Sequence, residues 1–240
     1  MHQTAEHHAA NPLLAPPRIW LQFELREVGF TAYCVGAEPT SANAAIVCIP
    51  NRSSSAERFI ALGQMLSNDP SVSVISIGTS STTRFWYPNS AFDASLEIQQ
   101  PYLDISLAVV ELICQRLICH IPINNISLFG FSEGACLALE YLARCGYPFN
   151  AVIALSGLLL GTSLDTSDRF NVATTRTKVF LSIGKPLSTA QRVRFRQTED
   201  ILKKCGYKVV TYTSERRPET ISPAELEMAR HVIVGSLPDC

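Results

Sequence analysis

Residues 126–145 read ISLFGFSEGACLALEYLARC, and this stretch decides the fold. Three of its first four residues are apolar, and this short run favours a buried strand. The pattern from Glu133 to Cys145 is helical, and the helix is expected to end at Gly146, a typical C-cap residue. Between strand and helix lies the G-x-S-x-G sequence of residues 130–134, in the context that a nucleophile elbow requires. The spacing therefore predicts a sharp strand-to-helix turn with Ser132 at its tip.

The chemistry of such a turn explains its residue types. Ser132 must adopt a strained backbone conformation, and small residues at positions 130 and 134 let strand and helix approach closely. The Ser132 hydroxyl then projects at the carboxyl end of the sheet, and the backbone N–H of Glu133 points at a developing oxyanion. Ser132 is therefore the predicted nucleophile. The alternative is a tight structural turn with an incidental serine.

Alternating strands and helices surround this turn. Strands are predicted over 19–27, 30–35, 44–49, 72–77, 126–129, 151–155, 179–183 and 208–213, and helices over 56–66, 102–119, 133–145, 191–205 and 223–234. Helices between strands indicate an α/β protein with a mainly parallel sheet covered on both faces. The first two strands, turning at Gly29, add an antiparallel edge hairpin. We expect a flexible tail over 1–17 and a single domain over 18–240.

Five segments also carry a family resemblance. They resemble the carboxylesterase, acyl-thioesterase and lysophospholipase branch of the α/β-hydrolases. The segments are Gly130 to Tyr141, Ala154-Leu155-Ser156-Gly157-Leu158, Phe85-Trp86-Tyr87-Pro88, Pro101-Tyr102-Leu103-Asp104, and Val179-Phe180-Leu181 with Arg194 to Leu202. The similarity runs from about residue 44 to residue 235 and is strongest between 85 and 160. It implies the α/β-hydrolase fold and the hydrolysis of short acyl esters or thioesters.

The resemblance also implies catalytic positions that this chain fills with unusual residues. A serine nucleophile needs a histidine base that is oriented by a carboxylate. The family's acid position is Leu187 here, and its histidine position is Glu219. The family's His-Gly turn after the third strand reads Pro50-Asn51-Arg52-Ser53, so the backbone N–H groups of Arg52 and Glu133 would form the oxyanion hole. These departures predict impaired or lost hydrolysis.

The histidines elsewhere in the sequence are poorly placed to act as the general base for Ser132. His231 is the only histidine after Ser132, and it lies far along the last predicted helix. His120 precedes the strand that leads to Ser132, so it should lie at the opposite end of the sheet. Three more histidines, at positions 2, 7 and 8, belong to the tail. Glu219 is the remaining candidate, but a carboxylate with a pKa of about 4.3 is a weak base unless a dry pocket raises that pKa.

The charged and aromatic side chains expected near Ser132 each have two possible interpretations. Glu133 replaces the family's usual glutamine, and its field opposes acyl transfer unless it points to solvent or pairs with Arg52. Trp86 and Tyr87 are either core residues or the apolar wall of a substrate pocket. Arg52 and Arg84 are either surface charges or groups that bind a carboxylate or phosphate.

The amino-acid composition excludes several classes of protein. The chain has 240 residues, of which 47% are hydrophobic and 17% charged, with a net charge of −1. This excludes a disordered protein and argues against nucleic-acid binding. Neither a signal peptide nor a membrane span is predicted, because the first residues lack an apolar h-region and the longest charge-free stretch is broken by proline and glycine. The eight cysteines form no C-x-x-C pair, so we expect no metal site. Most of them lie in apolar runs, where a reduced cysteine behaves as a small hydrophobe, so we expect reduced thiols and a cytoplasmic location. No cofactor is implied.

The charge is unevenly distributed. Residues 1–168 carry 7 Lys and Arg against 14 Asp and Glu, and residues 169–240 carry 13 against 7. Such a bias is typical of a solvated helix face, or of a docking surface for an acidic partner. The basic region 169–217 is therefore the candidate surface for a protein partner.

Three hypotheses follow. The preferred one is an esterase-like protein that keeps the elbow at Ser132 but is impaired or non-catalytic, with a residual ligand pocket. The second is an active carboxylesterase or thioesterase with an unconventional base. The third is a protein-interaction module that uses the basic late helices. Fold alone does not choose among them.

Overall fold

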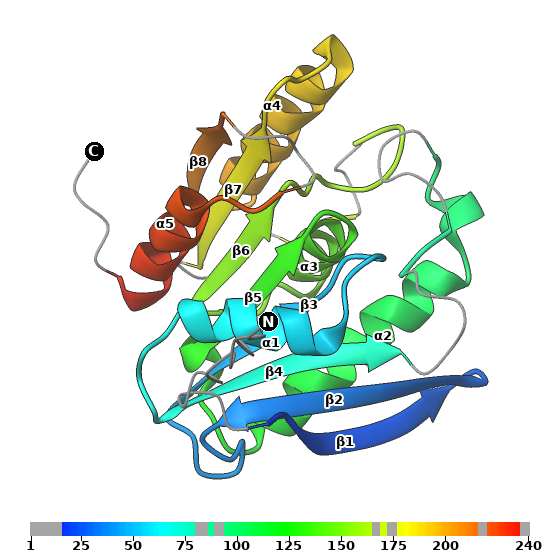
Figure 1. The fold of residues 1–240 in the computed structure, drawn as a ribbon. Helices are drawn as coiled ribbons and strands as arrows, with labels where there is room; N and C mark the ends of the chain where they lie inside the picture. The colour runs from blue at the N-terminus through cyan, green and yellow to red at the C-terminus, as the bar shows by residue number, and fades with distance from the viewer. Residues whose placement is uncertain are drawn as a thin grey trace, which may run out of the picture.

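The structure, a computed structural model, describes residues 16–79, 86–88, 94–164, 169–171, 177–215 and 220–235. A central sheet has the strand order β1-β2-β4-β3-β5-β6-β7-β8 (Figure 1). The strands are β1 (Arg18–Leu25), β2 (Val28–Gly36), β3 (Ala44–Ile49), β4 (Val72–Thr79), β5 (Ile126–Phe131), β6 (Ala151–Leu155), β7 (Lys178–Gly184) and β8 (Lys208–Ser214). β1–β2 and β2–β4 pair antiparallel and all other neighbours pair parallel. The predicted fold class is therefore confirmed.

Five α-helices are described, together with two short 3-10 helices. The α-helices are α1 (Ala56–Met65), α2 (Tyr102–Ile118), α3 (Glu133–Cys145), α4 (Thr189–Lys204) and α5 (Pro223–Val234). The 3-10 helices are η1 (Glu97–Gln99) and η2 (Ile123–Asn125). One core layer joins the sheet to α2, α3 and α4, and a second joins its other face to α1 and α5 (Figure 1). Burial on both faces explains the nearly continuous apolar runs of the central strands.

The first hairpin turns earlier than predicted. Arg26 and Glu27 form the turn with φ of +47° and +66°, and Gly29 lies within β2, opposite Glu24. A two-residue loop with positive φ at both positions matches the twist of the paired strands. Phe23 and Phe30 face each other in this register, with ring centroids 5.6 Å apart. The cross-strand aromatic pair therefore outweighs the local preference for glycine in the turn.

The start of α4 also differs from the prediction. The helix begins at Thr189 rather than Gln191, because Ser188 and Gln191 form a reciprocal capping box. The Ser188 hydroxyl accepts the Gln191 N–H at 3.2 Å, and the Gln191 side chain accepts the Ser188 N–H at 2.9 Å. Gln191 is thus the third residue of the helix, where it completes the cap.

Within the described ranges, no helix is both long and apolar enough to cross a membrane. The seven cysteines in those ranges are all free, and only Cys119 among them is exposed. Burial raises the pKa of the Cys136 thiol to about 11 and that of Cys145 to about 12. It raises the thiol pKa of Cys48 and Cys114 as well. These thiols are therefore weakly ionised, and all of them except the half-buried Cys145 are shielded from solvent.

We predict that native protein carrying Cys240→Ser reacts rapidly with a maleimide at one thiol, Cys119. The thiolate is the reactive species, and burial suppresses both ionisation and access at the other positions. Mass spectrometry after brief labelling at pH 7.5 measures the number of adducts. Adding Cys119→Ser should abolish the rapid phase. Rapid labelling of Cys48 or Cys114 in folded protein would contradict the burial described here.

Candidate active site

Ser132 occupies the turn between β5 and α3. Its φ of +53° and ψ of −117° are strained for a residue with a side chain. Backbone hydrogen bonds hold it: the Ser132 N–H donates to the Leu155 carbonyl at 2.8 Å, and the Cys136 N–H donates to the Ser132 carbonyl at 3.0 Å. The strained backbone expected from the sequence is thus present. The Ser132 side chain makes no capping hydrogen bond to α3, so its hydroxyl is not used to cap the helix.

The two glycines of the turn are required by close backbone contacts. A Cβ on Gly130 would lie 2.5 Å from the Gly134 carbonyl oxygen. A Cβ on Gly134 would lie 2.0 Å from the carbonyl oxygen of Ile49, at the end of β3. Either contact is shorter than real Cβ contacts allow, so glycine at both positions is what lets α3 pack on the strands.

A second strained serine lies at the end of the neighbouring strand. Ser156, which follows β6, also has a φ of +53°, and its N–H donates to the Ser182 carbonyl at 2.8 Å. The Ser182 hydroxyl in turn donates to the buried Glu225 carboxylate at 2.7 Å. Sequence reasoning missed this geometry. Its only local signal is a Ser-Gly pair directly after an apolar strand.

The predicted oxyanion loop is bound to the start of α3. The backbone N–H of Arg52 donates to Glu133 Oε2 at 3.1 Å, and the Arg52 guanidinium donates to Glu133 Oε1 at 2.5 Å. The guanidinium also donates to the Tyr87 carbonyl at 3.3 Å. Of the two arrangements considered for Glu133, the structure has the one paired with Arg52. The carboxylate thus lies on the N–H that was predicted to stabilise an oxyanion.

Trp86 and Tyr87 brace the same region. Trp86 is 5% exposed, and its indole N–H donates to the Pro50 carbonyl at 2.6 Å. Tyr87 is fully buried, and its hydroxyl donates to the Glu133 carbonyl at 3.4 Å. Burial holds the pKa of the Tyr87 hydroxyl well above its ordinary value, with Cys136 and Glu133 adding to the effect. Trp86 lines a cavity, whereas Tyr87 is not among the described residues of its lining. Phe85 and Arg84 lie outside the described residues.

The position expected for the acid holds no carboxylate. Leu187 lies between the end of β7 and Ser188, the N-cap of α4, and its half-buried side chain packs on the core. Its carbonyl accepts hydrogen bonds from the Arg192 guanidinium. Glu219, at the expected histidine position, lies outside the described residues.

The two described histidines are remote from Ser132. His120 is exposed and precedes β5, so it lies at the amino end of the strand that carries Ser132. His231 lies in the last turn of α5 and pairs with Glu227 at 3.0 Å. At ~1.5 Å per residue it is roughly 12 Å further along the helix than Pro223. His2, His7 and His8 lie outside the described residues.

A cavity of about 220 Å³ adjoins the oxyanion loop at the carboxyl ends of β3 and β4. Its described lining residues are Tyr33, Pro50, Asn51, Arg52, Ser54, Ser55, Ala56, Glu57, Ile77, Gly78 and Trp86. Ser132 is not among them, but Arg52 connects the cavity with the elbow through its ion pair with Glu133. No group of three or more His, Cys, Asp or Glu residues in the described ranges is arranged to hold a metal ion.

The sheet order, the flanking helices and the strained serine together define an α/β-hydrolase fold. Residues 76–234 match the family model described as Phospholipase/Carboxylesterase, and the chain belongs to that family. No curated protein matches the chain significantly in sequence.

Solved structures support the same assignment. A phospholipase/carboxylesterase from Dyadobacter fermentans is 29% identical, with a TM-score of 0.76 over 85% of this chain and 95% of that one. A carboxylesterase from Bacillus cereus is 14% identical, with a TM-score of 0.70 over 87% and 95%. A carboxylesterase from Mesorhizobium loti is 12% identical, with a TM-score of 0.66 over 89% and 99%. The two latter likenesses concern the fold alone.

We predict that Gly134→Ala destabilises the fold by about 3 kcal/mol, because its Cβ meets the backbone of β3 rather than a movable side chain. Urea unfolding followed by circular dichroism measures the change. Gly78→Ala is the matched control, because its Cβ would meet the Tyr33 ring at 3.3 Å. A small shift of that side chain relieves the contact, so a smaller loss of stability is expected. Equal destabilisation by the two substitutions would contradict the close packing at Gly134.

Proposed function

We propose that this chain is a phospholipase/carboxylesterase-family protein whose hydrolytic centre is impaired or inactive. In this proposal it binds a small ligand at the carboxyl edge of the sheet. The observation that carries the proposal is the Glu133 carboxylate on the backbone N–H of Arg52. The family resemblance makes that N–H an oxyanion donor, and here a negative charge already engages it.

A carboxylate at this point opposes acyl transfer in two ways. It engages a donor that the tetrahedral intermediate needs, and loss of one such donor typically lowers kcat by about 10²–10³-fold. It also places a negative charge beside the developing oxyanion. Two like charges ~4 Å apart near a protein surface repel by about 4 kcal/mol. The ion pair with Arg52 offsets part of this repulsion but does not release the N–H.

The position of Leu187 supports the same proposal. A leucine side chain neither accepts a hydrogen bond from a base nor stabilises its protonated form. By the family resemblance Glu219 takes the place of the histidine, and a carboxylate is a poor base for a serine hydroxyl. Nucleophile activation and oxyanion stabilisation are thus both weakened.

One observation favours an active carboxylesterase or thioesterase as the second candidate. Ser132 retains a backbone conformation that costs about 1–3 kcal/mol, and its hydroxyl does not cap α3. In that case Ser132 would attack a short acyl ester or thioester, with Glu219 as an unconventional base. The strain also has a structural source in the packing of Gly134 on β3, which weakens this argument.

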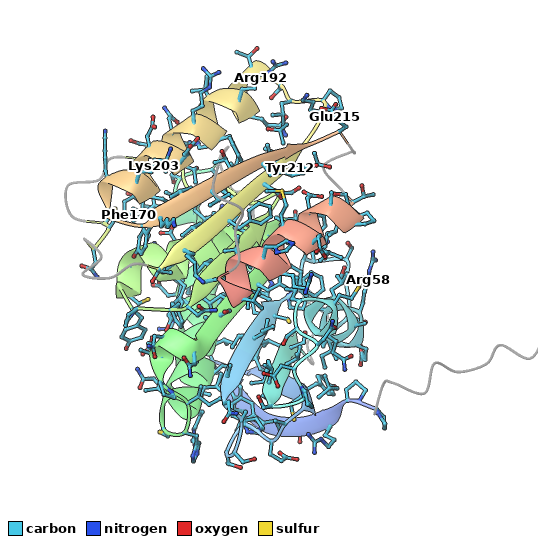
Figure 2. The ribbon with its side chains drawn as sticks, turned by 90° about the vertical axis from the view of Figure 1, so that its left-hand side faces the viewer. Arg58, Phe170, Arg192, Lys203, Tyr212 and Glu215 are labelled. Carbon is cyan, nitrogen blue, oxygen red and sulfur yellow. The ribbon has the colours of Figure 1, made fainter. Side chains whose placement is uncertain are left out.

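The basic region 169–217 remains a proposed surface for a protein partner. Figure 2 shows Arg192 and Lys203 near opposite ends of α4, and both side chains are exposed. Lys203 pairs with Glu199 on the same helix at 2.6 Å, so part of the basic charge is neutralised locally. This local pairing makes a partner surface a weaker candidate than the ligand pocket.

We predict that a fluorophosphonate probe labels the purified protein negligibly. Such probes react with an activated serine, and Ser132 lacks a competent base and oxyanion hole in this proposal. Intact-protein mass spectrometry measures the labelled fraction over time. An active serine hydrolase labelled in parallel confirms the reactivity of the probe.

Two variants sharpen the result. Leu187→Asp with Glu219→His restores the family's acid and base and should raise the labelling rate, and adding Ser132→Ala should abolish that labelling. Rapid labelling of the unchanged protein that disappears in Ser132→Ala alone would overturn the proposal in favour of the active esterase.

A further inference from the structure

The Arg52–Glu133 pair has the form of a carboxylate-binding site that an internal carboxylate occupies. We propose that a small organic carboxylate with an apolar or aromatic body displaces Glu133 from Arg52, and that this is the ligand class of the pocket. This inference rests on the proposed function, in which the chain binds a small ligand at the carboxyl edge of the sheet.

The geometry around Arg52 fits carboxylate recognition. One carboxylate accepts from both donors of the same residue, the backbone N–H at 3.1 Å and the guanidinium at 2.5 Å. A charge-assisted hydrogen bond from a guanidinium favours a carboxylate over a neutral group, and the backbone N–H supplies a second donor to the other oxygen. The Tyr87 carbonyl accepts a further hydrogen bond from the guanidinium and helps to orient it. A free carboxylate would find the same two donors already positioned.

The Glu133 side chain is a replaceable occupant. The Arg52 and Glu133 side chains are 47% and 20% exposed, so water reaches the pair. Ion pairs with this degree of exposure contribute little net stability. Glu133 is fixed through its backbone at the first turn of α3, and its side chain can rotate to solvent while the helix stays in place. A ligand therefore has to replace two hydrogen bonds without unfolding any element.

The adjoining cavity provides room for the body of such a ligand. Arg52 lines the cavity of about 220 Å³, and Tyr33 and Trp86 supply aromatic surface. Glu57 is the one acidic side chain among the described lining residues. A carboxylate on an aromatic ring, as in benzoate, would place its charge at Arg52 and its ring against the cavity wall. Benzamide has nearly the same shape without the charge.

Isothermal titration calorimetry with benzoate at pH 7 and about 0.15 M salt, where charges that do not touch the ligand are largely screened, tests the inference. Glu133→Gln keeps the size of the side chain but removes the competing charge, so it should bind benzoate about 10-fold more tightly than the unchanged protein. Arg52→Gln should lose detectable binding. Benzamide should bind weakly, and its affinity should be unaffected by Glu133→Gln.

Glu57→Gln is the matched control. It also removes a negative charge from the cavity but not from Arg52, so the benzoate affinity should change by no more than about 2-fold. Equal tightening by the two substitutions would show a general charge effect and overturn the inference. Equal affinity for benzoate and benzamide in Glu133→Gln, or no benzoate binding by that variant, would also overturn it. Thermal unfolding verifies that each variant is folded.

If Glu133→Gln does not fold, the unchanged protein still decides the question. Saturable benzoate binding that Arg52→Gln abolishes supports the inference, and binding that survives Arg52→Gln, or no binding, overturns it. The outcome of the fluorophosphonate experiment does not depend on the outcome of the benzoate experiment. Labelling of Ser132 would overturn the proposed function, whereas the benzoate series tests only the ligand class.

Discussion

The close approach of α3 to the end of β3 is the constraint on which the rest of the site depends. Gly134 lies so near the Ile49 carbonyl that even a single methyl group cannot be placed between them. This contact fixes where α3 begins, and so places Ser132 at the edge of the sheet. It also determines where Glu133 lies, because the loop of residues 50–52 follows Ile49 directly. The packing that forms the elbow therefore brings the Glu133 carboxylate to Arg52.

Residues 86 and 87 turn this contact into a rigid unit. The Trp86 indole holds the Pro50 carbonyl, the Tyr87 hydroxyl reaches the Glu133 carbonyl, and the Tyr87 carbonyl accepts from Arg52. Three segments that are distant in sequence thus meet at one point. Their backbones are fixed by buried groups, while the two charged side chains remain partly exposed. A backbone N–H held in place beside a movable carboxylate is what a displaceable ligand site requires.

Most of the fold was predictable because the governing signals are local. The bounds of β3, α3, β6 and α5 follow from apolar runs and from capping residues within the same segment. The hairpin turn at Arg26 and Glu27 was not predictable in this way, because the pairing of Phe23 with Phe30 selects the register. The same holds for the site. The strain at Ser132 is encoded in five consecutive residues, whereas the cavity is formed by separate segments of the chain.

The strained serine by itself does not distinguish hydrolysis from binding. Ser156 has the same φ as Ser132, and its N–H likewise donates to a carbonyl of the next strand, yet it lies outside the G-x-S-x-G sequence. Positive φ at the ends of β5 and β6 is therefore a property of how this edge of the sheet turns. Persistence of the conformation at Ser132 needs no catalytic explanation. The difference between the two functions lies in the charges at the edge, where Arg52 faces a carboxylate of its own chain. An oxyanion generated at Ser132 would have to compete with that carboxylate during each turnover, whereas a bound carboxylate ligand has to displace it only once.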